Sequence, residues 1–513
     1  MTDSPAMAGL PTIVIGAGPV GLAAAAQLAE RGMAFTVLEA GPQVAASVQA
    51  WGHVQLFSPW RYNTDSAARR LLTAAGWTEP DPDLLPTGSD LVERYLRPLS
   101  ELPAIKANLR FGCRVTAISR LGIDRVRSEG RDRTPFVVRL DNGDEVLGQA
   151  IIDASGTWTN PNVLGGNGLP APGEAEAAAW INHALPDVLK ADREQYAGKH
   201  TIVVGAGHSA ANTLLALAEL ADLAPDTRIT WAIRSSSPGG SFGGGGADEL
   251  PARGALGSGL KMLVDTGRVQ LAADFRTVRV HALAGSPQEG GVELTSRGPD
   301  GTEHTIVADR IVGATGFRPD YRFADELRLE LDPIMSAPKP VAPLIDPNQH
   351  SCGTVRPHGI DELAHPEPGY FAVGMKSYGR APTFLMATGH EQVRSIVAGM
   401  AGDWVAARDV QLELPDTGVC SATAGSEAIA QRLGLTHAEH ERLLTLTAKY
   451  LPSSPSAGAA VLTAARELGV SETSALQLAA FAAEQFDVAP VVNLGPDPQL
   501  VVVPAAGNSA CCN

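Results

Sequence analysis

Cysteine and aromatic residues are scarce in this chain. Its 513 residues include five cysteines at irregular spacing, and aromatic side chains make up only 5% of the composition. An odd number of unevenly spaced cysteines does not form the disulfide framework that small secreted domains use, so the sequence indicates a reducing, cytoplasmic environment. Any cysteine chemistry in this protein has to be argued one site at a time.

Long apolar runs and an excess of positive charge are also missing. No stretch reaches the roughly 18 to 20 apolar residues that span a bilayer, and the first residues lack the basic region of a secretion signal. The formal net charge is -16, which disfavours contact with nucleic acid or with an anionic membrane surface. We therefore expect a cytoplasmic protein whose partner is a small-molecule substrate.

Glycine, in contrast, is abundant, and part of it forms a motif that occurs twice. In the first copy, Gly16, Gly18 and Gly21 follow a predicted strand at 12–15 and open a helix. These glycines permit a tight turn, a close approach of a pyrophosphate, and close packing of the helix on the strand. The next strand ends on Glu39, whose carboxylate can bind both ribose hydroxyls and repels a 2'-phosphate. This pattern favours FAD or NAD here, the alternative being a nucleotide-free glycine turn.

The second copy differs in the residue that ends its second strand. Gly205, Gly207 and Ala210 again join a strand to a helix, but the strand that follows leads to Arg234 instead of an acid. An arginine at this place can pair with the 2'-phosphate of NADP. The second unit is therefore predicted to bind NADPH, and the alternative for Arg234 is a solvated charge at a strand end.

Two further segments, AIIDASG at 150–156 and RIVGATG at 310–316, repeat one another. The resulting prediction is an α/β fold with two Rossmann-like dinucleotide-binding domains, the FAD domain being split by an inserted NADPH domain, plus a small C-terminal helical appendage. The predicted bounds are 1–165 with 310–408 for the FAD domain, 166–309 for the NAD(P)H domain, and 409–513 for the appendage with its Cys-Cys tail.

Two nucleotide units in this order, with the ASG and ATG turns, resemble the FAD/NAD(P) flavoprotein superfamily over about residues 10–400. This superfamily includes disulfide reductases and the flavin-containing, class B-like monooxygenases. The resemblance implies that the first unit holds FAD, with the Gly316 turn closing over it, and that the second holds NADPH. The implied cofactor-binding residues are Gly16, Gly18, Gly21 and Glu39 for FAD, and Gly205, Gly207, Ser209, Ala210 and Arg234 for NADPH.

The branch of the superfamily is indicated by missing cysteines. Disulfide reductases carry a CxxxxC or CxxC pair beside the flavin, and this chain has neither; Met375 also stands where they have an aspartate. The segment WRYNTDS resembles the monooxygenases, whose active-site asparagine Asn63 matches. The resemblance implies that Asn63 is catalytic and donates a hydrogen bond to activated oxygen, the alternative being an ordinary turn asparagine. A helix predicted from about Pro382 to Met400 would begin beside the flavin.

The last cysteines suggest the substrate. Cys511 and Cys512 are adjacent, and Cys420 can add a third thiolate, a set that suits soft ions such as trivalent arsenic. The segment around Cys352 resembles flavoproteins associated with arsenic-resistance operons. We therefore expect arsenite or an organoarsenical held by Cys420, Cys511 and Cys512, the alternative being that all of them are ordinary thiols.

Together these features predict an NADPH-dependent FAD monooxygenase that uses O2 to oxidise a soft nucleophile. Two alternatives stay open at this point: a flavin-dependent thiol or metalloid reductase that uses the C-terminal cysteine pair, and a metalloid-binding protein with structural FAD. The sequence also leaves a homodimer open.

Overall fold

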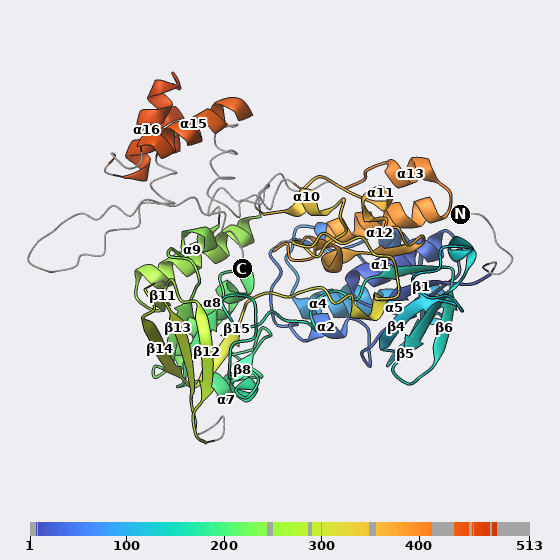
Figure 1. Ribbon diagram of the computed structural model, residues 1–513, viewed down its shortest axis with the longest axis horizontal. Helices are drawn as coiled ribbons and strands as arrows, with labels where there is room; N and C mark the ends of the chain where they lie inside the picture. Colours follow the sequence, from blue (N-terminus) through green and yellow to red (C-terminus); the bar gives the residue numbers. More distant parts are fainter. Residues whose placement is uncertain are drawn as a thin grey trace, which may run out of the picture.

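The computed structural model describes residues 7, 9–243, 250–285, 290–298, 300–347, 355–382, 384–412, 435–450, 454, 456–471 and 474–479. Within these residues the chain forms two five-stranded parallel sheets, each accompanied by a three-stranded antiparallel sheet. Figure 1 shows the two parallel sheets in separate domains that lie side by side, with the early strands in blue and the later ones in green. The predicted α/β fold with two Rossmann-like domains is confirmed.

The first sheet is built from strands that are distant in sequence. Its order is β16-β7-β1-β2-β3, and every neighbouring pair is parallel. Apolar residues alternate between its two faces: Val14 packs towards the helices, whereas Ile13 and Ile15 face the antiparallel sheet. The bounds of the strands are β1 Thr12–Ile15, β2 Phe35–Leu38, β3 Leu109–Arg110, β7 Ala150–Asp153 and β16 Tyr370–Ala372, with β4 Val115–Arg120, β5 Phe136–Leu140 and β6 Glu145–Gly148 in the antiparallel sheet.

Helices α1 (Pro19–Glu30) and α12 (Met386–Met400) cover one face of this sheet and pack against each other. Their contact depends on small residues. A Cβ added to Gly389 would lie 2.6 Å from Cγ2 of Val20, which is closer than two carbon atoms can approach. The start of α12 is therefore held tightly against the first turn of α1.

The second sheet repeats the plan in the order β11-β10-β9-β15-β8, again with parallel pairs. Helices α8 and α9 cover one face and the antiparallel strands cover the other. The bounds are β8 Ile181–Asn182, β9 His200–Val204, β10 Arg228–Ala232, β11 Gln270–Ala272, β15 Arg310–Gly313, α7 Arg193–Tyr196, α8 His208–Leu223 and α9 Pro251–Asp265, with β12 Thr277–Ala282, β13 Val292–Arg297 and β14 Glu303–Ala308 in the antiparallel sheet.

Strand β15 corrects the predicted domain boundary at residue 310. It pairs with β9 on one side and β8 on the other, so residues 310–313 belong to the second domain. The physical reason is that segment 310–316 is the counterpart of segment 150–156. Strand β15 pairs with β9 in the second sheet, just as β7 pairs with β1 in the first. The chain returns to the first domain only after this strand. Residues 160–162 and 315–318, which link the domains, are hydrogen-bonded to each other and meet in an antiparallel bridge between Pro161 and Phe317.

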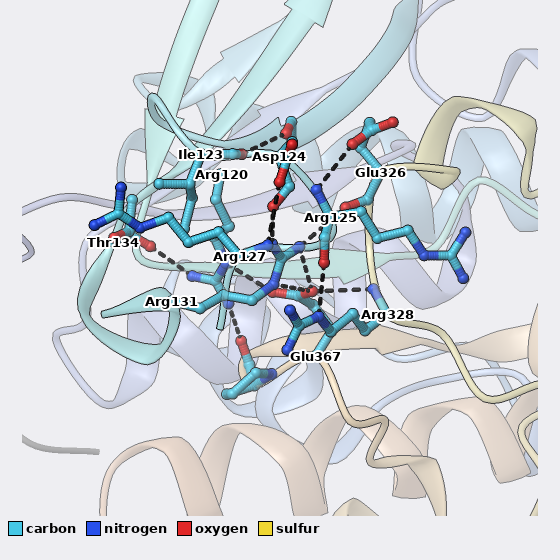
Figure 2. A network of polar contacts seen from close by, with 12 residues as sticks. Arg120, Ile123, Asp124, Arg125, Arg127, Arg131, Thr134, Glu326, Arg328 and Glu367 are labelled. Atoms are coloured by element: carbon cyan, nitrogen blue, oxygen red, sulfur yellow. Dashed lines mark hydrogen bonds and ion pairs between the residues drawn. The ribbon is translucent and has the colours of Figure 1, made fainter. Parts of the chain in front are cut away.

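A buried ion network joins the antiparallel sheet of the first domain to the segment before β16 (Figure 2). Glu367 accepts hydrogen bonds from Nε of Arg120 at 2.7 Å, from Nε of Arg131 at 2.9 Å and from the backbone N–H of Arg328 at 3.0 Å. The side chain of Glu367 is 0% exposed, and those of Arg120 and Arg131 are 1% and 4% exposed. One carboxylate is therefore shared by two cations inside the protein.

The remaining helices are short, except for a pair near the end of the chain. Helices α15 (His437–Tyr450) and α16 (Ala457–Glu467) pack against each other, with Leu443 and Ala464 in an apolar cluster that also includes Leu478, and Figure 1 shows them in orange-red, outside both sheets. Among the described residues, no helix has the length and apolar character needed to cross a bilayer. The other α-helices are α2 Ala46–Gln49, α3 Ser66–Ala74, α4 Gly88–Leu91, α5 Arg97–Glu101, α6 Pro103–Lys106, α10 Ala342–Ile345, α11 Ile360–Leu363 and α13 Trp404–Arg408.

Candidate nucleotide-binding sites

The first glycine turn lies between β1 and α1. Gly16 has a φ of +95°, and a Cβ there would lie 2.8 Å from the carbonyl oxygen of Ala154. A Cβ on Gly21 would lie 2.0 Å from the carbonyl oxygen of Gly16, whereas one on Gly18 would meet nothing within 4 Å. Gly16 and Gly21 are thus needed for packing, and Gly18 leaves open space at the N-terminus of α1, where backbone N–H groups favour an anion.

Glu39 follows β2 and holds this turn. Its Oε2 accepts a hydrogen bond from the backbone N–H of Ala17 at 2.6 Å, and its Oε1 accepts one from Gly41 at 2.7 Å. The carboxylate is half-buried. Two carboxylate oxygens offer about four acceptor positions, so those that remain can bind ribose hydroxyls without releasing the turn.

The second glycine turn joins β9 to α8 with the same geometry. Gly205 has a φ of +130°, and a Cβ there would lie 2.1 Å from the carbonyl oxygen of Ala314. The indole Nε1 of the buried Trp231 donates a hydrogen bond to the carbonyl oxygen of Gly205 at 2.7 Å, which fixes the turn. Gly207 is the N-cap residue of α8 and has open space around it. This turn also leaves room for an anion at a helix N-terminus.

The two other residues predicted in this turn lie within α8. Ala210 is completely buried and stands where the first unit has Gly21, so the helix packs closely here as well. The carbonyl oxygen of Ser209 accepts a hydrogen bond from the hydroxyl of Thr213 at 2.9 Å, one turn further along α8. Both residues are held by the helix immediately after the turn.

Arg234 lies two residues beyond the end of β10. Its Nη1 donates to the carbonyl oxygen of Gly166 at 3.2 Å. Desolvation, followed by the nearby charge of Arg276, lowers the pKa of Arg234 from its usual value. Both influences disfavour the charged form of Arg234, so a bound anion such as a phosphate would stabilise it.

Gly316 lies at the crossing between the two domains. It follows β15 in the second sheet, and its carbonyl oxygen accepts a hydrogen bond from the backbone N–H of Asn162 at 2.9 Å. The neighbouring Thr315 donates its hydroxyl to the carbonyl oxygen of Asn162 at 2.9 Å. Gly316 therefore belongs to the crossing between the domains, beside the second turn, because its strand is the third central strand of the second sheet.

Asn63 is completely buried, and its amide is engaged by the loop around it. Its Nδ2 donates to the carbonyl oxygens of Ser58 at 2.7 Å and Pro59 at 3.0 Å, and its Oδ1 accepts the hydroxyl of Ser58 at 3.0 Å. Both amide hydrogens are used within the loop. In this arrangement Asn63 holds the turn, and it has no donor left for an oxygen species, contrary to the role that the resemblance implies.

A buried ion pair adjoining the first turn was missed by the sequence reasoning. Oδ2 of Asp153, at the end of β7, accepts hydrogen bonds from Nζ of Lys376 at 2.7 Å and from the hydroxyl of Tyr370 at 2.6 Å. Oδ1 of Asp153 accepts the hydroxyl of Ser155 at 2.6 Å. Asp153 and Lys376 are both 0% exposed. This network fixes the residues on either side of Ala154, against which Gly16 packs.

Lys376 carries its charge in an aromatic setting. Its Nζ lies 4.1 Å from the ring centre of Phe323 and 4.8 Å from that of Tyr321. Burial lowers the pKa of Lys376, and the charge of Asp153 opposes that effect. The only sequence signal was an aspartate that ends an otherwise apolar strand, which is weak evidence for a charged partner 223 residues away.

The start of α12 is tied to the turn after β16. Oε1 of Gln392 accepts the backbone N–H of Gly374 at 2.8 Å, and its Nε2 donates to the hydroxyl of Ser377 at 2.9 Å. Helix α12 begins at Met386, slightly later than the predicted Pro382. The helix is therefore fixed beside Val20 of α1 and the first glycine turn.

The two domains also meet through side chains. The ring of Phe57 in the first domain lies against that of His208, the first residue of α8, with centroids 5.1 Å apart and planes tilted by 45°, and the Arg253 guanidinium lies 5.9 Å from the centre of the Phe57 ring. No sequence motif indicated this contact. It brings the loop that contains Asn63 to the start of α8.

The cysteines predicted to bind a metalloid, Cys420, Cys511 and Cys512, lie outside the described residues, as does Cys352. Cys113, which is described, is buried, and its thiol lies 3.4 Å from the carbonyl oxygen of Phe111. In the part of the chain that the structure describes, no group of three or more His, Cys, Asp or Glu side chains is placed to hold a metal ion.

Parts of this chain are similar to known proteins. Residues 13–241 match the pyridine nucleotide-disulphide oxidoreductase family. Over 204 residues the chain is 29% identical to indole-3-pyruvate monooxygenase YUCCA1 of Oryza sativa subsp. japonica, which is 38% of this chain and 42% of that protein. The chain thus matches about two-fifths of the length of this curated relative.

Solved structures share the fold. The bacillithiol disulfide reductase Bdr (YpdA) of Bacillus cereus has a TM-score of 0.55 at 17% identity, covering 77% of this chain and 99% of that one. The FAD-bound cadaverine monooxygenase DfoA of Erwinia amylovora has a TM-score of 0.53 at 14% identity, covering 80% and 99%. The chain therefore has the two-domain FAD/NAD(P) flavoprotein fold that flavin monooxygenases and FAD-dependent disulfide reductases share.

Proposed function

We propose that this protein is an FAD-dependent monooxygenase that takes its electrons from NADPH. The observation that carries this proposal is the pair of glycine turns, each with open space at a helix N-terminus, followed by residues of opposite charge. Glu39 follows the first turn and Arg234 the second. The two units therefore have different nucleotide preferences, as an enzyme with a retained flavin and an exchanging nicotinamide requires.

The residues of the first unit fit FAD. Gly18 leaves space for a pyrophosphate, Glu39 has acceptor positions for the ribose, and the buried Asp153–Lys376 pair keeps the floor of the turn rigid. When bound, FAD would supply two-electron transfer and the activation of O2. The protein's part is to hold the cofactor through backbone N–H groups and to place the N-terminus of α12 beside it.

Arg234 and Arg276 support NADPH over NADH at the second unit, because a 2'-phosphate would offset their mutual repulsion. Arg234→Gln should lower kcat/KM for NADPH about 10-fold or more and leave that for NADH unchanged, since a hydrogen bond to a charged group contributes about 1.5–3 kcal/mol. The matched control is Arg228→Gln, at the opposite end of β10. Equal losses with both nucleotides would contradict the assignment.

Oxygen chemistry is favoured over disulfide chemistry by the sequence. The chain has no CxxxxC or CxxC pair, and the curated relative it matches is a monooxygenase. The decisive test is oxygen uptake coupled to NADPH oxidation, with ¹⁸O from labelled dioxygen appearing in the product. A flavoprotein that consumes NADPH only to reduce a disulfide would show no incorporation.

A thiol or metalloid reductase is the second candidate, because bacillithiol disulfide reductases share the fold and the chain carries the adjacent Cys511 and Cys512. In that case the cysteine pair would exchange electrons with the flavin. The double variant Cys511→Ser, Cys512→Ser would then fail to reoxidise reduced flavin anaerobically, whereas the unmodified protein would succeed. Equal anaerobic behaviour of the two proteins would exclude the reductase.

For the substrate we propose a soft nucleophile, specifically trivalent arsenic as arsenite or an organoarsenical, captured by Cys420, Cys511 and Cys512. One oxygen atom of O2 would be added to arsenic, which loses two electrons, and the other would be reduced to water with two electrons from NADPH. Arsenite should raise the rate of NADPH oxidation, and replacing the three cysteines by serine should raise KM for arsenite. Absence of a metalloid response would remove arsenic while leaving monooxygenation of another substrate.

A metalloid-binding protein with structural FAD is the remaining alternative. It would bind arsenite through the same cysteines without consuming NADPH faster than the uncoupled background. Turnover well above that background, with any acceptor, would exclude this function.

A further inference from the structure

The short helical turn Gly374–Tyr378, which follows β16, packs against the start of α1. A Cβ added to Gly374 would lie 3.1 Å from Cγ2 of Val20, and one added to Gly389 of α12 would lie 2.6 Å from the same atom. Val20 is the second residue of α1. The turn after β16 and the start of α12 therefore meet at the helix end where FAD is proposed to bind.

Gln392 of α12 holds this turn with its whole amide group. Its Oε1 accepts the backbone N–H of Gly374 at 2.8 Å, and its Nε2 donates to the hydroxyl oxygen of Ser377 at 2.9 Å. The Ser377 hydroxyl donates in turn to the carbonyl oxygen of Gly374 at 2.7 Å. Nε2 of Gln392 also lies 2.9 Å from Nε2 of His358. Because a backbone N–H can only donate, the bond to Gly374 fixes the orientation of the Gln392 amide.

His358 completes this chain of hydrogen bonds as a neutral ring with a defined tautomer. It is 4% exposed, and its Nδ1 lies 3.1 Å from the carbonyl oxygen of Arg356. A carbonyl oxygen can only accept, so Nδ1 carries the hydrogen, and Nε2 has the lone pair that accepts a hydrogen from Gln392. In this arrangement every polar atom of the His358 and Gln392 side chains has a partner.

A proton on Nε2 of His358 is incompatible with this arrangement. Two donors would then face each other 2.9 Å apart. Turning the Gln392 amide over would offer His358 an oxygen, but it would bring the amide NH2 group against the N–H of Gly374. Protonation therefore either breaks the bond to Gly374 or leaves a buried donor without an acceptor.

Burial is the main influence on the protonation of His358. It lowers the pKa of His358 from its usual value; the Arg356 carbonyl and the Glu362 carboxylate of α11 oppose this effect, and the Arg356 guanidinium adds to it. The ring of Tyr378 lies 5.6 Å from that of His358, and burial raises the pKa of Tyr378, so it is uncharged. The other titratable groups of α11, α12 and the turn are His390, whose pKa burial lowers to about 4, and members of three ion pairs, Asp361–Arg408, Glu391–Arg394 and Lys376–Asp153.

We propose that His358 is a positioning residue for FAD: its neutral ring, acting through Gln392, holds the turn after β16 against α1, and protonation of the ring loosens both the turn and the flavin. This inference rests on the FAD site of the proposed function. The proton comes from water and is taken up at Nε2 as the turn opens.

FAD should accordingly bind most tightly above about pH 6.5. When the turn is open, water reaches His358, and the ring takes up a proton with its ordinary pKa of about 6.5. In the FAD-loaded form the buried ring has a lower pKa. The affinity for FAD is therefore full above about pH 6.5 and falls below it by at most about 10-fold per pH unit, until the pH reaches the lowered pKa.

The test is the dissociation constant of FAD, measured by flavin fluorescence between about pH 5 and about pH 7.5. In the unmodified protein it should rise at least about 5-fold as the pH falls across this range. In His358→Gln the amide oxygen can replace Nε2 as the acceptor but does not titrate, so the rise should shrink to less than about 2-fold. His365→Gln is the matched control: His365 is also buried and lies against Tyr370 of β16, but its Nδ1 accepts the backbone N–H of Glu330 instead of a hydrogen of Gln392. This control should keep the full rise.

Hydrogen exchange of segment 373–378, followed by mass spectrometry and corrected for the intrinsic effect of pH, gives a readout that does not use the flavin. Protection of this segment should fall at low pH in the unmodified protein and not in His358→Gln. The shorter His358→Asn, which keeps a donor for Arg356 but does not reach Gln392, should show low protection and weak FAD binding at every pH. This variant guards against an effect of folding, since circular dichroism should show the native content of helix and strand.

The outcomes separate this role from the proposed function. Equal pH dependence of FAD binding in the unmodified protein and in His358→Gln would overturn the role of His358 alone, and so would equal pH dependence of exchange in segment 373–378. Absence of bound FAD at every pH would overturn the proposed function and this role with it.

Discussion

Removing the charge of Glu367 should destabilise the first domain more than removing any comparable surface charge. Glu367 is the acid that two buried arginines share, at 2.7 Å from Arg120 and 2.8 Å from Arg131. In Glu367→Gln the shape is kept, but both guanidinium groups lose their counter-charge. Breaking a buried ion pair by removing one partner costs about 3–5 kcal/mol, and we expect a loss of stability of this size.

The structure offers a matched control on the antiparallel sheet of the second domain. Glu303 also pairs with two arginines, Arg279 at 2.9 Å and Arg297 at 2.7 Å, but all three side chains are solvent-accessible. Glu303→Gln should leave the unfolding midpoint nearly unchanged, since water already screens these charges. Urea unfolding of the FAD-loaded proteins, followed by circular dichroism, compares the two variants.

Hydrogen exchange gives a local readout of the same effect. A loss of about 3–5 kcal/mol raises the population of the opened state about 10² to 10⁴-fold. The amides of β4 and β5, next to Arg120, should therefore exchange faster in Glu367→Gln, and those of the second sheet should not. If Glu367→Gln proves no more harmful than Glu303→Gln, the reasoning from burial is refuted.

The effect should also depend on pH. Burial alone would raise the pKa of Glu367, but hydrogen bonds from Arg131, the backbone of Arg328 and Arg120 bring its pKa below the usual value of 4.5. A carboxyl group with a lowered pKa stabilises the folded state fully above its unfolded pKa and loses that contribution as pH falls through its folded pKa. The difference between the unmodified protein and Glu367→Gln should thus be full at pH 7 and shrink below about pH 4.5.

Three further changes test the turns and the second buried pair. Gly205→Ala places a Cβ 2.1 Å from the carbonyl oxygen of Ala314, so NADPH-dependent flavin reduction should be lost; unchanged kinetics would show that the turn can move. Trp231→Phe removes the hydrogen bond to Gly205 and should cost about 1 kcal/mol or more and raise KM for NADPH, measured by steady-state kinetics. Lys376→Met leaves the buried carboxylate of Asp153 without its cation and should cost about 3–5 kcal/mol; restoration of the thermal midpoint by a second change, Asp153→Asn, would identify charge and not volume as the cause.

The fold could be predicted from local sequence patterns, because the residues that define it are contiguous in sequence. Glycines are needed at positions 16, 18 and 21 within one turn. A Cβ on Gly16 or Gly21 would lie under 3 Å from a backbone carbonyl oxygen, which explains why the motif can be recognised in the sequence. The second turn follows the same local pattern. Ala210 occupies the third position of its motif and is completely buried. Short apolar strands before each turn made the two Rossmann-like units recognisable.

Features that depend on residues distant in sequence could not be predicted from local sequence patterns. The role of Asn63 was inferred from its neighbours in sequence, but its amide is used by Ser58 and Pro59, which only the folded loop shows. The partner of Asp153 lies 223 residues away at Lys376, and no pattern within one segment can report such a pair. The placement of residues 310–313 in the second sheet was missed for the same reason, since strand pairing decides it.

The order of strands in the first sheet has a consequence for how the protein is made. Strand β7 pairs with β1 and with β16, and the hydrogen bond from Tyr370 to Asp153 spans 217 residues. During synthesis, β7 therefore presents an unpaired edge while the whole inserted domain is being translated. Because residues 160–162 and 315–318 meet, the inserted domain can fold first and bring its two ends together, which shortens the effective loop that β16 must close. On this basis the second domain acts as an internal folding aid for the first, and slowing its folding should expose the edge of β7 to aggregation.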